Sequence, residues 1–81
     1  MPAYANKSGD SPIIGYELEA DDDGRVVALE VTFRHRKRRR LTTYRYEGAI
    51  AAALAPLAIA GSGLAAHIAR ERPRYVARWV D

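Results

Sequence analysis

Hydrophobic and polar residues alternate along three consecutive segments in the first half of the chain, residues 11–20, 25–33 and 40–48. The side chains that share the more hydrophobic face are Ile14, Tyr16, Leu18 and Ala20, then Val27, Leu29, Val31 and Phe33, then Thr42, Tyr44 and Tyr46. A period of two is typical of strands with one buried face. Short connections between such strands predict an antiparallel meander that is open to water on its other face.

Matching the hydrophobic faces of the second and third segments fixes their register, because a shift of one residue would turn every side chain to the wrong side. Val31 then lies opposite Tyr44, and Glu30 lies opposite Arg45 on the outer face. Arg45 has two candidate roles, a cross-strand ion pair with Glu30 or contact with a ligand. The connecting turn contains no Gly or Asn, which favours a loop of about four residues over a tight two-residue turn.

Beyond Gly48 the hydrophobic spacing becomes helical. Ile50, Leu54 and Leu57 lie on one stripe, and many alanines between them permit close approach to the sheet. Pro56 removes an amide donor and clashes with the preceding turn, so this helix is expected either to kink or to split. The 22 residues 48–69 carry no formal charge, but their alanine content and their Pro and Gly residues favour two short packed helices over a membrane span.

The segment after these alanines predicts a second helix and a last strand. Gly61 or Gly63 is expected to end the first helix in a left-handed conformation. Ser62 is the expected N-cap of a second helix over residues 63–71, which Pro73 ends. Residues 74–80 are a candidate fourth strand with Tyr75, Ala77 and Trp79 on one face. The predicted fold class is therefore α+β, a three-stranded antiparallel meander packed against two short helices, with a C-terminal edge strand as a further candidate.

The length of 81 residues and the composition predict one small domain. Residues 1–10 lack the basic and hydrophobic regions of a signal peptide. They are expected to be a disordered lead-in to a single domain over residues 11–81. The chain has no cysteine, which excludes disulfides and cysteine-based metal sites and fits a reducing compartment. We therefore expect a cytoplasmic protein that is not bound to a membrane.

No pattern typical of a catalytic or metal site emerges. His35 and His67 fall in different elements, Ser62 is better explained as a helix cap than as a nucleophile, and the acidic run 21–23 is better explained as a solvated turn. The chain "AGSGLAAH" lacks the lysine and the spacing of a phosphate-binding loop. The sequence thus predicts a protein that is not an enzyme and that has no cofactor and no metal.

Charge is divided unevenly along the chain. Residues 1–33 carry seven acids and two bases, whereas residues 34–81 carry eleven bases and three acids. Six of the 13 Lys and Arg residues fall in "RHRKRRR", and the predicted nucleic-acid-binding residues are Arg34, Arg36, Lys37, Arg38, Arg39 and Arg40. Cations at the tip of a hairpin can contact phosphates and release counterions. We therefore expect a module that binds RNA or another polyanion through hairpin 34–40, without reading base sequence.

Two questions remain open from the sequence. Tyr44, Tyr46 and Trp79 could stack on unpaired bases or could pack in the core, although the two tyrosines share a face with Phe33 and so fit the core. The alternative function is a protein-interaction module. An exposed strand edge could pair with a protein partner or with a second copy in a homodimer, helped by the acidic and basic surfaces.

The ordered set of motifs resembles a known family. The segments "IIGYELE", "ALEVTF", "YRYEG" and "LAAHIARERPRY" occur in this order with a Tyr-x-Tyr at Tyr44 to Tyr46. In this the chain resembles the KTSC domain, a small module found at the C-terminus of some lysyl-tRNA synthetases and alone in many bacterial proteins. The resemblance covers roughly residues 11–75, and it implies an α+β fold and, through the synthetase association, RNA binding. The family's hairpin before Tyr-x-Tyr is usually short and Gly-rich, where this chain has Arg and Lys.

Overall fold

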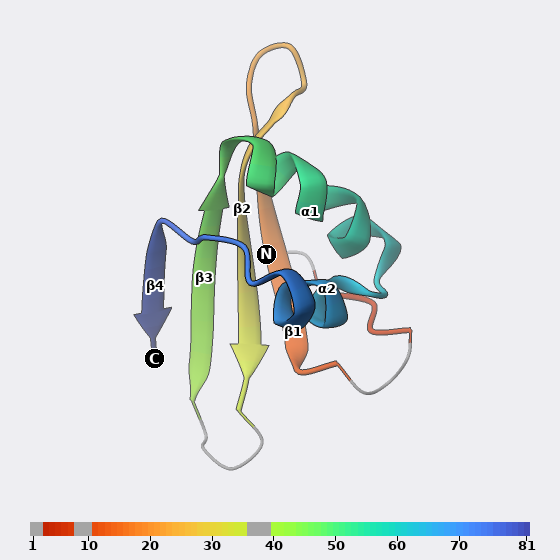
Figure 1. The fold of residues 1–81 in the computed structure, drawn as a ribbon, viewed down its shortest axis with the longest axis vertical. Coiled ribbons are helices and arrows are strands. Elements are labelled where there is room, and N and C mark those ends of the chain that lie inside the picture. Colours follow the sequence, from red (N-terminus) through yellow and green to blue (C-terminus); the bar gives the residue numbers. More distant parts are fainter. Residues whose placement is uncertain (1–2, 8–10, 36–39) are drawn as a thin grey trace.

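The structure is a computed structural model that describes residues 3–7, 11–35 and 40–81. Its elements, in chain order, are β1 Ile13–Ala20, β2 Val26–Arg34, β3 Leu41–Glu47, α1 Gly48–Ala60, α2 Leu64–Glu71 and β4 Ala77–Val80 (Figure 1). The four strands form one antiparallel sheet in the order β1-β2-β3-β4. The predicted α+β class, with two helices and a fourth strand at the edge, is confirmed.

The register between β2 and β3 is the one that the hydrophobic faces predict. Val31 pairs with Tyr44, and Glu30 pairs with Arg45. Both helices lie against the same face of the sheet, which we call the helix-covered face, while no described residue forms a helix over the opposite face, the open face (Figure 1). The last strand, β4, pairs with β3 and brings the end of the described chain beside the base of the β2–β3 hairpin.

Two β-bulges change which hydrophobic side chains reach the core. Ile14 is the extra residue at an irregularity in β1, so Ile13 rather than Ile14 lies opposite Phe33 and is buried. Val27 is the extra residue at a second irregularity, where Val26 packs against the core and Val27 stays 41% exposed. The expected inward positions of Ile14 and Val27 are therefore wrong, because each bulge shifts the alternation by one residue.

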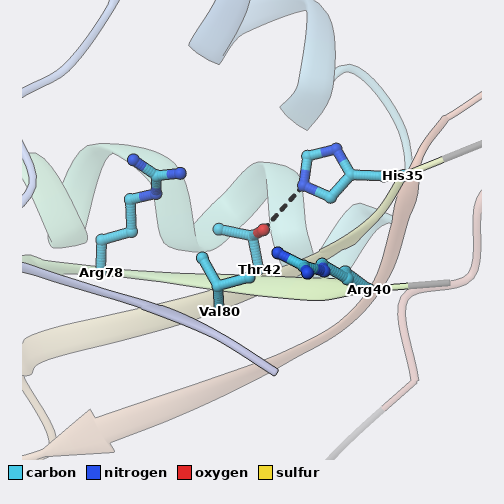
Figure 2. A pocket seen from close by; sticks show the side chains of 5 residues that line it. All are labelled: His35, Arg40, Thr42, Arg78 and Val80. Carbon is cyan, nitrogen blue, oxygen red and sulfur yellow. Dashed lines mark hydrogen bonds between the residues drawn. The ribbon is translucent and has the colours of Figure 1, made fainter. Parts of the chain in front are cut away.

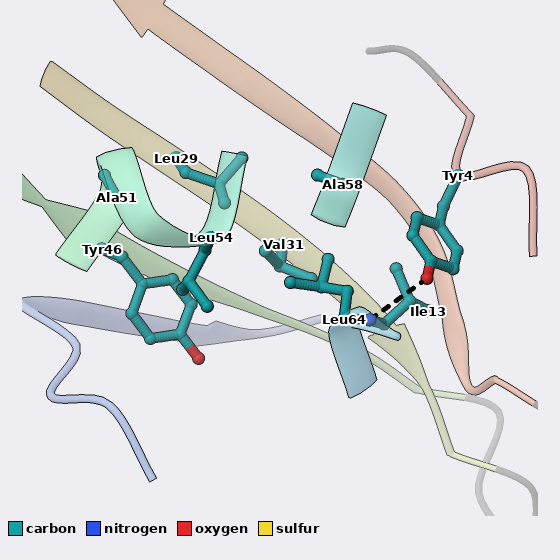
Figure 3. Packing of buried hydrophobic residues seen from close by; sticks show 9 residues of the cluster. All are labelled: Tyr4, Ile13, Leu29, Val31, Tyr46, Ala51, Leu54, Ala58 and Leu64. Atoms are coloured by element: carbon teal, nitrogen blue, oxygen red, sulfur yellow. Dashed lines mark hydrogen bonds between the residues drawn. The ribbon is translucent and has the colours of Figure 1, made fainter. Parts of the chain in front are cut away.

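The core lies between the sheet and the two helices (Figure 3). Its buried members come from both layers and from the chain before β1, namely Tyr4, Ile13, Leu29, Val31, Tyr46, Ala51, Leu54, Ala58 and Leu64. Small alanine side chains on α1 allow Leu54 to reach the central strands between them. The core therefore combines a few large side chains with alanines of α1 that pack against the sheet.

Helix α1 is continuous through Pro56. The carbonyl that Pro56 cannot bond belongs to Ala52, and both residues lie on the exposed side of the helix. Water can hydrate that carbonyl there, which lowers the cost of the missing hydrogen bond. Of the two alternatives that Pro56 left open, a kink and a split, the split does not occur. Within the described residues, neither helix is long and hydrophobic enough to cross a bilayer.

At the junction between the helices, the end of α1 is capped as predicted but the start of α2 is not. Gly61 ends α1 with a φ of 72°, as expected, and its N–H donates to the carbonyls of Leu57 and Ala58. The N-cap of α2 is Gly63, which has no side chain to accept a hydrogen bond, so the expected Ser62 cap is wrong. Instead, the first amide of α2, at Leu64, donates to the hydroxyl of Tyr4 at 3.4 Å (Figure 3).

Residues 3–7 pack against this junction and against β1. Tyr4 is 6% exposed, its N–H donates to the Ile14 carbonyl at 3.3 Å, and the Lys7 N–H donates to the Gly61 carbonyl at 2.8 Å. The expectation of a disordered lead-in does not describe these five residues, since a buried tyrosine holds them to the domain. The segment docks because the apolar ring of Tyr4 is buried in the core and its hydroxyl accepts the hydrogen bond from the Leu64 amide.

Substitution of Gly61 tests this docking. A side chain at position 61 would collide with Ala5, whereas one at Gly24, which also has a positive φ, would meet nothing within 4 Å. We expect Gly24→Ala to cost about 1–2 kcal/mol from backbone strain alone. Gly61→Ala should cost a further 1–3 kcal/mol or so from overpacking. Urea denaturation followed by circular dichroism measures both, and equal losses of unfolding free energy would show that residues 3–7 are not packed on the junction.

Candidate nucleic-acid interface

The predicted basic residues that the structure describes lie at the base of the β2–β3 hairpin. Arg34 is the last residue of β2 and Arg40 directly precedes β3, and both are exposed. The pairing continues beyond the strands, because the His35 N–H donates to the Arg40 carbonyl at 3.3 Å. The other predicted binding residues, Arg36, Lys37, Arg38 and Arg39, lie outside the described residues.

A small cavity of about 200 Å³ opens on the helix-covered side of this base. It is lined by His35, Arg40, Thr42, Arg78 and Val80 (Figure 2). Thr42 and Val80 are partners across the β3–β4 pair, so they form the strand-derived floor. In Figure 2 the hydroxyl of Thr42 lies between Arg78 on one side and His35 and Arg40 on the other. The fold thus places the side chains of His35, Arg40 and Arg78 around one cavity.

The polar floor of this cavity is already hydrogen-bonded. Thr42 is fully buried, and its hydroxyl lies 2.7 Å from Nε2 of His35. Among the described lining residues there is no carboxylate, so Arg40 and Arg78 have no acidic partner inside the cavity. Guanidinium groups gathered in this way suit a phosphate or carboxylate, which can accept several charge-assisted hydrogen bonds. The side chains that line the cavity are therefore chemically suited to an anion.

The predicted binding residues include neither His35 nor Arg78, and of these two Arg78 is distant from them in the sequence. It lies on β4 opposite Tyr44, and its guanidinium carbon is 5.8 Å from the centre of the Tyr44 ring. Such a position favours a cation–π contact that holds the side chain over the sheet. The sequence places Arg78 far from "RHRKRRR", and only the pairing of β4 with β3 brings the two together. Arg78 could have been predicted only if the pairing register of the last strand with residues 41–47 had been known.

The sequence did not decide which aromatic residues lie in the core, and the structure places some in the core and others at the surface. Tyr46 is 2% exposed, and burial, with smaller contributions from Tyr44 and Tyr75, raises its pKa to about 12. Tyr46 is therefore a neutral core residue. Trp79 lies on the open face opposite Thr43 and is half exposed. Tyr75 contacts Tyr44 on the helix-covered face, so the expectation that Tyr75 and Trp79 share a face is wrong.

Arg45 is held on the open face by three carboxylates. Its guanidinium donates to Glu19 at 2.8 Å, Glu30 at 2.9 Å and Glu47 at 2.9 Å. The predicted pair with Glu30 is confirmed, and the two further pairs extend it. Hydrogen bonding to Glu19, Glu47 and Glu30, in that order of importance, raises the pKa of Arg45. The same contact with Arg45 lowers the pKa of Glu19 below its usual value of 4.5.

The open face is therefore acidic around Arg45, and the register places Arg34 further along the same face. Glu17 pairs across the strands with Glu30, which adds a fourth carboxylate to the three that bind Arg45. Arg45 is committed to these acids, which favours its structural role over contact with an anionic ligand. No cluster of three or more His, Cys, Asp or Glu residues suited to a metal ion occurs in the part of the chain that the structure describes.

Comparison with known proteins gives no relative: no protein-family model matches the chain, and no curated protein or solved structure matches it significantly. The resemblance to the KTSC domain thus stays a prediction from the motifs.

Replacing Arg45 should change how stability responds to acid. Because the pKa of Glu19 is lower in the folded than in the unfolded chain, its contribution to the unfolding free energy is present above pH 4.5 and is lost as pH falls further. We expect Arg45→Met to be less stable near neutral pH and to lose less on acidification than the unsubstituted protein. Urea titrations over a series of pH values measure both effects.

Arg70→Met is the matched control for this substitution. Arg70 pairs with Glu71 at 3.3 Å, but both side chains are more than half exposed, and such a pair contributes little. Its pH profile should follow that of the unsubstituted protein. A profile for Arg45→Met that is as steep as the control would show that the Glu19 contact does not contribute to stability.

Proposed function

We propose that this chain is a small, non-enzymatic binding module that binds RNA through the base of the β2–β3 hairpin. The observation that carries the proposal is the convergence of Arg40, Arg78 and His35 on one cavity without a carboxylate among its described lining residues. In sequence, Arg40 and His35 flank four further cationic residues, 36–39. A phosphate in the cavity would therefore lie beside the two residues that flank this basic segment of the sequence.

The distribution of charge between the two faces also favours ligand binding on the helix-covered face. The open face carries the carboxylates that surround Arg45, and a phosphate chain would be repelled there. The helix-covered side of the hairpin base carries Arg40 and Arg78. The protein thus offers a polyanion one attractive and one repulsive surface, which orients the ligand without any contact to base edges.

Binding of this kind has a clear energetic signature. Each phosphate neutralised in a single strand releases counterions and contributes about 0.7 to the slope of log affinity against log salt. A module of this size that contacts only a few phosphates should therefore bind weakly at physiological salt. It should work beside other binding domains, whose linked contacts raise the overall affinity.

Self-association is the competing function, and one observation favours it. β4 is the last strand in the sheet order, and its residues Trp79 and Val80 remain 48% and 47% exposed. An edge strand with exposed large side chains can pair with the same edge of a second copy. In that case the basic residues would serve solubility or contact an acidic face. Sizing chromatography distinguishes the two, because a dimer free of nucleic acid would favour self-association.

The RNA proposal is tested by removing the two arginines of the cavity. A fluorescence anisotropy titration with a short labelled RNA at two salt concentrations gives the affinity and its salt slope. We expect Arg40→Ser with Arg78→Ser to weaken binding about tenfold or more and to lower the slope by roughly 1.4, the value for two lost phosphate contacts.

Arg25→Ser with Arg70→Ser is the control, because it removes the same charge elsewhere. Arg25 lies in the β1–β2 turn at the other end of the sheet, and Arg70 lies on α2 paired with Glu71. This variant should retain nearly all of the affinity. If both double variants lose affinity equally, binding follows net charge and the cavity is not the site.

A further inference from the structure

A second cavity lies next to the basic one on the helix-covered face. It has a volume of about 320 Å³ and is lined mainly by aromatic side chains, among them Phe33, Tyr44 and Tyr75, and also by Arg72 and Pro73. It forms where the chain leaves α2 and crosses back over the sheet toward β4. The described residues around it include no carboxylate, so it shares the electrostatic character of its neighbour.

The aromatic rings in this cavity form a connected set. Tyr44 meets Phe33 with ring centres 5.5 Å apart and planes at 89°, and it meets Tyr75 at 5.0 Å and 67°. Tyr44 is half-buried between these neighbours, whereas Tyr75 keeps 46% of its surface exposed. An exposed ring supported from behind by another ring is a ready platform for a flat ligand.

Tyr75 is held in place from both sides. Before it, Arg72 closes α2 in a left-handed conformation with a φ of 46°, and its N–H donates to the Ile68 carbonyl at 2.9 Å. Pro73 then restricts the backbone. After it, the Val76 N–H donates to the Arg45 carbonyl at 2.8 Å. The backbone around Tyr75 therefore does not have to be ordered by the ligand, which lowers the entropic cost of binding.

The two cavities meet at one contact. Arg78 lines the basic cavity and its guanidinium lies over the ring of Tyr44, which lines the aromatic cavity. A ligand that spans this contact would place an anionic group beside Arg78 and Arg40 and a flat group against Tyr75. A nucleotide with an unpaired base has both groups joined by its sugar.

We infer that the aromatic cavity is a nucleobase site, in which one unpaired base stacks on Tyr75 while its phosphate lies in the basic cavity. This inference rests on the proposed function and narrows it to single-stranded nucleic acid. Bases inside a duplex are stacked on each other and present only edges, so they cannot cover the ring. The cavity offers aromatic surface to any base, so the site favours unpaired strands and does not select a sequence.

The experiment compares strands with and without bases. The probes are a labelled oligouridine RNA, a strand of equal length made of abasic sugar-phosphate units, and an RNA duplex, each titrated by anisotropy at low salt. The unsubstituted protein should bind the oligouridine more tightly than the abasic strand. It should also bind the oligouridine more tightly than the duplex when the two affinities are compared at equal numbers of phosphates. Tyr75→Leu, which keeps a hydrophobic side chain, should weaken oligouridine binding about fivefold to a hundredfold and leave abasic binding unchanged.

Tyr75→Phe is the matched control, because it keeps the ring and should bind oligouridine like the unsubstituted protein. Urea denaturation confirms that each variant is folded. Equal binding of the oligouridine and abasic strands by the unsubstituted protein would overturn the nucleobase site, and so would unchanged oligouridine binding by Tyr75→Leu. The effect of the Arg40 and Arg78 substitutions would then still support the phosphate site. If no strand binds the unsubstituted protein, the proposed function itself fails.

Discussion

The packing of α1 on the central strands is the contact on which the rest of the fold depends. Ala51 and Ala58 are buried at 0% and 1% exposure on either side of Leu54, so the helix backbone can approach β2 and β3 closely. An 81-residue domain has room for only a small core, and each fully buried leucine contributes about 1.5–3 kcal/mol. The second helix, the docked residues 3–7 and the return of the chain toward β4 all assemble around this layer.

Alternation along the strands predicted the sheet well, because one buried face forces a period of two and thereby fixes the β2–β3 register. The same rule failed at Ile14 and Val27, since a bulge shifts the alternation without leaving a clear mark in the sequence. Local rules also predicted Ser62 as a helix cap. The group that bonds the start of α2 is the hydroxyl of Tyr4, sixty residues earlier, which no local rule can identify.

The site was predicted in part for the same reason. Arg40 follows from the hairpin, which is a local feature, whereas the predicted Arg34 does not line the cavity. The Arg45–Glu30 pair follows from the register. Arg78 and Tyr75 join the site only through the pairing of β4 and the path from α2, both of which are tertiary features. The uneven charge along the sequence becomes an uneven charge between faces. Acids of the first two strands share the open face with Arg45, whereas Arg40 and Arg78 line the opposite side of the hairpin base.

The short strand β4 gives this arrangement a thermodynamic consequence. Its four residues carry Arg78 and are held on one side only, by pairing with β3. An edge strand of this length is among the first parts of a domain to open. A ligand that binds Arg78 binds the closed form of the strand, so occupancy of the site and protection of β4 amides from hydrogen exchange are linked functions of the same equilibrium. The stability of this short edge strand would thus report on a ligand bound at Arg78.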